Sequence, residues 1–303
     1  MKIALVSAPV WNGDIDRNVR TMVRYLGKLR GQADVVVFGE SVLQGFDCLC
    51  WDYAADRHTA VTLTDASIQR MRTAARESGT AVSFGFVERY GETLYSSQIF
   101  IGADGKIINV FHRVSAGWKD CRFTDDHYRE GERFASFPYC GKTFAVGLCG
   151  DLWTAGRPAE MRALSADVVL WPVWCDYPAG EWNRSVKLEY ARQAGQCGHA
   201  CCLSIPAARI RQRQTQLPAV RSGSKMRKSC QSCRPEPRAS SLRNSGRMGD
   251  HGKYVPNIDK RKALSYTDQV KKTPVFAGIG YFLRNKMISG GRHGFYGNTE
   301  SCH

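Results

Sequence analysis

The chain has 303 residues, 43% of them hydrophobic, which is enough for one large α/β domain or two ordinary ones. Its net charge of +15 does not indicate a nucleic-acid-binding fold: residues 1–203 hold 23 cations and 23 anions, whereas residues 204–303 hold 20 cations and 5 anions. The N-terminal apolar run is too short for a signal peptide or a membrane span, so we expect a cytoplasmic protein whose twelve cysteines are mostly thiols.

The first part of the chain alternates apolar strands with amphipathic helices, which predicts an α/β fold with a mixed sheet. The expected strands lie at 2–8, 33–40, 81–89, 94–102, 106–114, 142–151 and 166–174. The expected helices are one capped by Asn12 or Asp14, one started by Thr64 or Asp65, and two near 157–165 and 181–196. An Asp104-Gly105 pair predicts a hairpin between two of the strands.

The composition changes after residue 203. From Ser204 to about Gly252 the sequence is dense in Arg, Ser, Gln and Pro without a helical or strand period, and beyond it only 274–283 resembles a strand. We therefore expect a folded domain over 1–203 and a basic, low-order tail over 204–303. A reading-frame change in the gene would explain the tail, and so would a disordered basic arm that binds a polyanion. Cys230-x-x-Cys233 is half of a zinc pattern without a correctly spaced second half, so no metal is predicted.

Three strand ends carry residues suited to catalysis. VVVFGESVLQGF (35–46) delivers Glu40 after a buried strand, where burial favours proton transfer near neutral pH. GLCGDLW (147–153) places a thiol, Cys149, beside a backbone N–H at Gly150. The strand at 106–114 ends in basic residues, with Lys119 six residues beyond Arg113. Each has a structural alternative when taken alone: a helix cap, a packing cysteine and a solvated basic strand end.

Taken together and in order, these stretches resemble the nitrilase superfamily of carbon–nitrogen hydrolases over residues 1 to about 200. FGE with a following Gly-aromatic pair is similar to the family's F-P-E motif, and GLCGDLW to its I-C-Y-D-x-R/W motif. ADVVLWPVW (166–174) resembles the strand after the nucleophile helix. The resemblance implies an α-β-β-α sandwich with a mixed sheet, incomplete or irregular at the C-terminus of this chain.

The resemblance also implies roles for individual residues. Glu40 would be the general base, Cys149 the nucleophile of a thioester mechanism and the Gly150 N–H an oxyanion donor. FHRVSA (111–116) aligns Arg113 with the family's lysine in Y-R-K-V-x-L, which departs from the pattern. Arginine supplies a charge but is bulkier and keeps its proton, so Lys119 stays open as a second candidate.

The resemblance further implies the substrate and the assembly. The family's substrate-positioning glutamate falls where Glu130 or Asp126 stands, and Trp174 ends the strand that lines the acyl pocket. We expect a small amide, carbamoyl or nitrile substrate, no metal or organic cofactor, no nucleic-acid or membrane partner, and a homodimer or larger homo-oligomer. A catalytically impaired relative and a basic-tailed polyanion-binding protein are the alternatives.

Overall fold

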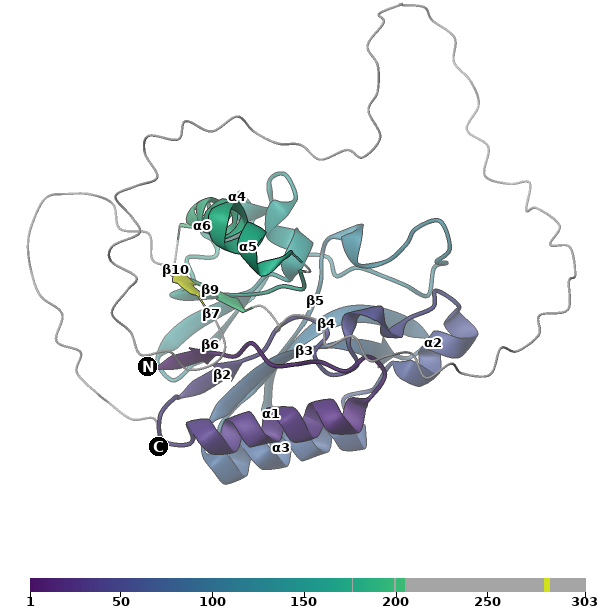
Figure 1. Cartoon of the computed structure of the whole chain (residues 1–303), viewed down its shortest axis with the longest axis horizontal. Helices are drawn as coiled ribbons and strands as arrows, with labels where there is room; N and C mark the ends of the chain where they lie inside the picture. Colours follow the sequence, from purple (N-terminus) through teal and green to yellow (C-terminus); the bar gives the residue numbers. More distant parts are fainter. Residues whose placement is uncertain (176, 199, 205–280, 284–303) are drawn as a thin grey trace, which may run out of the picture. The chain divides into compact units, whose positions relative to one another are not determined.

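The computed structural model describes residues 1–175, 177–198, 200–204 and 281–283 (Figure 1). All described residues belong to one compact unit. The predicted tail, with its Cys230/Cys233 pair, therefore lies outside the described residues apart from Ser204 and 281–283.

The first sheet is mixed, as predicted, with the strand order β1-β2-β3-β4-β5. β1, β2 and β3 run parallel, whereas β3, β4 and β5 form antiparallel hairpins. Gly91 and Gly105 turn these hairpins with φ angles of +59° and +79°, which glycine adopts without strain. The strands are β1 (Ile3–Leu5), β2 (Val35–Val37), β3 (Ala81–Tyr90), β4 (Thr93–Ile101) and β5 (Ile107–His112).

Two helices, α1 (Ile15–Leu29) and α3 (Ala66–Ser78), lie side by side against one face of this sheet (Figure 1). Of the two cap candidates for each helix, Asp14 and Asp65 accept the capping hydrogen bonds from backbone N–H groups. The helices bury their apolar stripes with outward-facing side chains of β2, β3 and β4 in one cluster. A short helix, α2 (Tyr53–Thr59), was not predicted, because its sequence is polar and lacks a sustained apolar stripe.

The second sheet has the order β10-β9-β8-β7-β6. β7, β8 and β9 are parallel, and the two outer strands pair antiparallel with their neighbours. The strands are β6 (Ser136–Tyr139), β7 (Lys142–Val146), β8 (Val168–Pro172), β9 (Ala200–Ser204) and β10 (Tyr281–Leu283). β10 is the end of the segment at 274–283 that resembled a strand in the sequence.

The helical segments that accompany this sheet are shorter than predicted. α4 spans Arg157–Ala163, close to the expectation. The helix expected at 181–196 is divided into α5 (Ala179–Glu181), a π-helical turn (Trp182–Val186) and α6 (Lys187–Gly195). None of the helices in the described residues is both long and apolar enough to cross a membrane.

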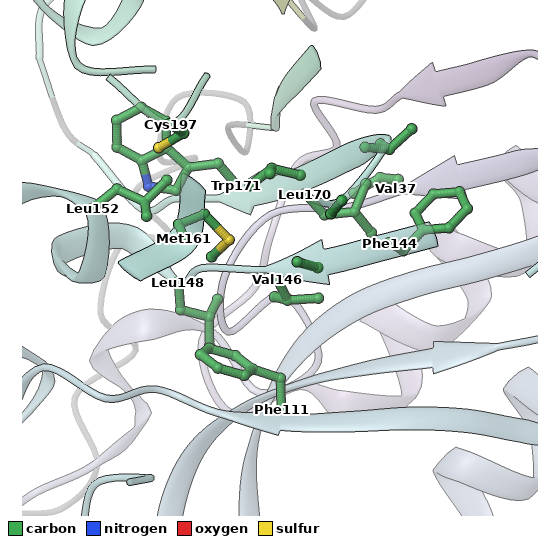
Figure 2. Packing of buried hydrophobic residues seen from close by; sticks show 14 of the residues in the cluster. Val37, Phe111, Phe144, Val146, Leu148, Leu152, Met161, Leu170, Trp171 and Cys197 are labelled. Carbon is green, nitrogen blue, oxygen red and sulfur yellow. The ribbon is translucent and has the colours of Figure 1, made fainter. Parts of the chain in front are cut away.

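One buried cluster joins the two sheets and the helices of the second sheet. Figure 2 shows Val37 of the first sheet beside Phe144 and Leu170 of the second, and Phe111 of the first sheet below Leu148, which follows β7; Met161 of α4 belongs to the same cluster. The layers are therefore helix, sheet, sheet and helix, which confirms the predicted fold class. Side-chain packing thus holds the two sheets together and brings the loops at their strand ends close to one another.

Candidate active site

Glu40 follows β2 and is fully buried. Its loop packs directly on the backbone of β3 at Gly85: a Cβ at that glycine would lie 2.4 Å from the Ser41 nitrogen and 2.7 Å from the Glu40 Cα. The Gly85 N–H also donates to the Gly39 carbonyl at 3.1 Å. Gly85 was not predicted to matter, although a glycine inside a strand pattern is itself a sign of close backbone approach.

Arg113, the first residue after β5, forms an ion pair with Glu40. Its Nη1 lies 2.8 Å from Glu40 Oε1, and both side chains are almost completely buried. The Ser96 hydroxyl donates to the same carboxylate oxygen at 3.4 Å, and the Trp174 N–H donates to the other oxygen at 3.2 Å. The carboxylate is thus fixed by three donors from three segments of the chain.

Arg113 keeps its charge in this environment. Burial is the largest single influence and opposes the charged form, but the attraction of Glu40 together with smaller contributions from Cys149 and Asp151 outweighs it, so the pKa of the guanidinium is raised above its ordinary value. A second nitrogen contact orients the side chain, because Nε donates to the Ser115 hydroxyl at 2.9 Å. The site therefore contains a permanent, oriented positive charge.

Cys149 begins a short 3-10 turn (Cys149–Trp153) shortly after β7. Its φ is +41°, a left-handed conformation that is uncommon for a residue with a side chain. The Trp171 indole N–H donates to the Cys149 carbonyl at 2.9 Å, and the thiol lies 3.7 Å from the Trp174 carbonyl oxygen. The turn and these two contacts direct the thiol toward the end of β8, where Glu40 also finds a partner.

The Cys149 thiol is protonated at rest. Burial raises its pKa most strongly, and the nearby Glu40 charge raises it further, while Arg113 acts in the opposite direction. A base is therefore needed to generate the thiolate, which is the nucleophilic form. The carboxylate of Glu40 is placed to accept that proton.

Asp151 ties the cysteine turn to the arginine loop, a role that was not predicted. Its buried carboxylate accepts hydrogen bonds from the backbone N–H groups of Val114 at 3.0 Å, Ser115 at 2.8 Å and Leu148 at 2.8 Å. Burial nevertheless raises the pKa of this carboxyl to about 6. A charged residue within an apolar run after the cysteine was the available signal in the sequence.

Lys119 and Glu130, which the sequence offered as site residues, lie in a separate cluster. Lys119 Nζ lies 3.0 Å from the Glu130 carboxylate and also donates to the Tyr128 carbonyl. The Trp118 indole N–H donates to Glu130 at 3.2 Å. Among the described residues, no hydrogen bond or ion pair joins Lys119 to Glu40 or Cys149, so Arg113 is the cation that accompanies the carboxylate.

Asp126 lies at the surface beside that cluster. It lines an opening of about 320 Å³ together with other residues that include Lys119 and Glu130. The structure therefore brings together the two residues between which the sequence did not choose, Asp126 and Glu130, but it places both with Lys119 rather than with the thiol.

Trp174 contributes to the site through its backbone and presents its ring to Phe46. The two rings are stacked, with centroids 5.4 Å apart and planes 8° from parallel. Phe46 is the aromatic residue of the Gly-aromatic pair that follows Glu40, yet no local pattern indicated its contact with Trp174. The stack forms an aromatic element beside the carboxylate and the thiol.

Comparisons with known proteins identify the family of this chain. The profile of the family described as carbon–nitrogen hydrolase matches residues 2–219. A nitrilase from Penicillium rubens is 32% identical over 202 residues, and an (R)-stereoselective amidase from a Pseudomonas species is 26% identical over 170 residues. These matches cover 61% and 56% of this chain, and the chain spans only 60% and 59% of the length of these two relatives.

The fold is also found in a solved structure. An amidase from a Nesterenkonia species superposes with a TM-score of 0.56 at 17% identity, over 68% of this chain and 76% of that one. The family profile covers more than half of the chain, so the resemblance noted in the sequence is confirmed. The chain belongs to the carbon–nitrogen hydrolase family.

Proposed function

We propose that this protein hydrolyses a non-peptide carbon–nitrogen bond in a small amide or nitrile through a thioester on Cys149. The observation that carries the proposal is the meeting of Glu40, Arg113 and Cys149, which come from three strand ends far apart in the sequence. Nitrilases and an amidase among the relatives support the reaction class.

The reaction begins with proton transfer from the Cys149 thiol to the Glu40 carboxylate. The thiolate then attacks the amide or nitrile carbon, and negative charge develops on the substrate oxygen or nitrogen. Arg113 and the Gly150 N–H stabilise this charge. With an amide, the tetrahedral adduct collapses, Glu40 returns the proton, and ammonia leaves.

Water completes the cycle by hydrolysing the thioester. Glu40 accepts a proton from the water molecule as its oxygen attacks the acyl carbon, and the proton then passes to the departing sulfur. The products are a carboxylic acid and a free Cys149 thiol. With a nitrile, a first water converts the thioimidate to the same tetrahedral adduct.

Substrate panels test the proposal directly. The full-length protein is incubated with aliphatic and aromatic amides, carbamoyl compounds and nitriles, and ammonia and carboxylic acid are quantified. We expect release that Cys149→Ala abolishes and that Cys121→Ala, a substitution of an exposed free cysteine, leaves unchanged. Equal release by the wild type and Cys149→Ala contradicts the proposal, and a folded wild-type protein that releases nothing from the whole panel supports the impaired alternative.

We propose in addition that the enzyme is cytoplasmic and works as a homodimer or a larger homo-oligomer. Light scattering coupled to gel filtration of the full-length chain tests the assembly. A mass equal to one chain at all concentrations contradicts it. Salt-dependent retention on immobilised RNA or DNA is the corresponding test of the polyanion-binding alternative for residues 204–303.

A further inference from the structure

The outer nitrogen of Arg113, Nη2, lies in a narrow space between two glycines. A Cβ built on Gly150 would lie 2.5 Å from Nη2, and one built on Gly117 would lie 3.3 Å from it. The first distance is impossible for real atoms, and the second requires the guanidinium to move. The position of Arg113 therefore depends on the absence of a side chain on both sides.

Backbone conformation does not explain these glycines. Neither Gly117 nor Gly150 has a positive φ, in contrast to Gly45, whose φ is +90°. An alanine at position 117 or 150 would therefore be compatible with the backbone as it stands. Space for the guanidinium is what the two positions provide.

We call the space between Gly150 and Gly117 the slot. Nη2, the nitrogen that occupies it, is also the Arg113 nitrogen without a hydrogen bond to the described residues. Arg113 Nη1 donates to Glu40 and Nε donates to Ser115, whereas Nη2 has no acceptor among the residues that the structure describes. The guanidinium is rigid and planar, so fixing two of its nitrogens fixes the direction of the third. Nη2 is thus an oriented, charged donor next to the residue that follows Cys149.

We propose that Gly150 and Gly117 are positioning residues that select arginine as the cation of this site and present its Nη2 to the anion formed at Cys149. The proposal rests on the proposed function, because hydrolysis supplies that anion. It also connects the two departures from the family motifs: arginine replaces lysine at 113, and glycine replaces the tyrosine of I-C-Y-D at 150. These two positions are in contact.

The proposal predicts a specific dependence between positions 113 and 150. A Cβ at position 150 would displace the guanidinium. A lysine at position 113 ends in a single ammonium group, which is smaller and does not fill the slot. Gly150→Ala should therefore be harmful beside arginine and nearly neutral beside lysine. Such non-additivity is the signature of a direct interaction.

The test is a double-mutant cycle with Gly150→Ala, Arg113→Lys and the combined variant. The first measurement is the rate at which iodoacetamide alkylates Cys149, followed by peptide mass spectrometry over a range of pH. Arg113 lowers the thiol pKa, so its displacement in Gly150→Ala should move the alkylation profile to higher pH and slow alkylation at neutral pH about tenfold, one pKa unit. In the Arg113→Lys background the same substitution should change the rate by less than about twofold.

Steady-state kinetics of amide hydrolysis provides the second measurement. Gly150→Ala should lower kcat much more than it changes KM, because the displaced donor acts on charge that forms during the reaction. Gly27→Ala is the matched control, since a Cβ at that exposed helix position meets nothing within 4 Å. It should leave both measurements unchanged.

The outcomes separate the inference from the proposed function. Equal effects of Gly150→Ala in the two backgrounds, or no effect in either, overturn the slot even if hydrolysis depends on Cys149. Alkylation does not require turnover, so a coupled shift in its pH profile supports the slot even if no amide is hydrolysed. In that case only the proposed function fails.

Discussion

Two cation–carboxylate pairs lie near strand ends of this protein. They have similar nitrogen–oxygen distances but differ in burial and in their neighbours. Arg113 and Glu40 lie 2.8 Å apart with 4% and 0% of their side chains exposed, whereas Lys119 and Glu130 lie 3.0 Å apart with 13% and 25% exposed. Burial makes the first pair sensitive to the loss of either member. The second pair is closer to the surface, where such pairs contribute little.

Their surroundings differ as well. Lys119 also donates to the Tyr128 carbonyl, and Glu130 accepts from the Trp118 indole N–H. Both charged groups therefore have further partners within their own cluster. The Arg113–Glu40 pair has a protonated thiol beside it and an arginine nitrogen without an acceptor among the described residues. The Arg113–Glu40 pair thus has a free donor and a thiol neighbour, which a reaction requires, whereas the contacts of the Lys119–Glu130 pair stabilise the local structure.

The largest expected effect comes from Glu40→Gln. Loss of the proposed general base should lower kcat for hydrolysis by about 10²–10⁴-fold. The same change removes a negative charge that raises the Cys149 pKa, so alkylation by iodoacetamide should shift to lower pH and become faster at neutral pH. Undiminished kcat in Glu40→Gln would contradict the assigned role, and circular dichroism confirms that the variant is folded.

Arg113→Met breaks the buried pair from the other side. The uncompensated Glu40 charge should lower the free energy of unfolding by about 3–5 kcal/mol, measured by urea denaturation. The Cys149 pKa should rise, since Arg113 is the group that lowers it most, and alkylation should require higher pH. An unchanged unfolding midpoint would show that the pair is not buried as described.

Asp151→Asn tests the connection between the cysteine turn and the arginine loop. An asparagine presents an NH₂ group to at least one of three backbone donors, which should cost about 1–3 kcal/mol of unfolding free energy. We expect a loss of hydrolysis as well, because the turn that presents Cys149 loses an anchor. Asp120→Asn, at a carboxylate whose one ion-pair partner among the described residues is the exposed Arg122, is the control and should change neither quantity.

The smallest expected effect belongs to Lys119→Met. The pair with Glu130 is partly exposed, so the free energy of unfolding should fall by about 1 kcal/mol or less. The pH profile of Cys149 alkylation should stay in place. A shift as large as that of Arg113→Met would remove the distinction between the two pairs and restore Lys119 as a candidate for the site.

The sequence predicted the elements that have strong local patterns. Continuous apolar runs indicated the strands before Glu40 and Cys149, and a single strand-end residue, Arg113, was aligned with the family's lysine. The sequence alone could not decide whether Arg113 or Lys119 is the cation of the site, because the answer depends on how the loop between them folds back. Tertiary packing alone determines that choice.

Other features lacked a local signal. The short strand β6 contains Pro138, which weakens a strand pattern, and it is stabilised by tertiary contacts: it pairs with β7, and its buried Phe137 packs on Phe100 and Phe144. The contacts of Asp151 span more than thirty residues, and the stack of Phe46 on Trp174 joins two distant loops. Sequence periodicity carries no information on such distances.

Trp174 touches the carboxylate and the thiol only through its main chain: its N–H binds Glu40 and its carbonyl lies near the Cys149 sulfur. Main-chain contacts survive when the side chain is replaced. Under the proposed function, a change of side chain at this position would alter the aromatic stack with Phe46, and with it the range of acyl groups accepted, while the main-chain contacts to Glu40 and Cys149 stay in place. Substrate range and reaction chemistry would then depend on different atoms of one residue, the ring for the first and the main chain for the second.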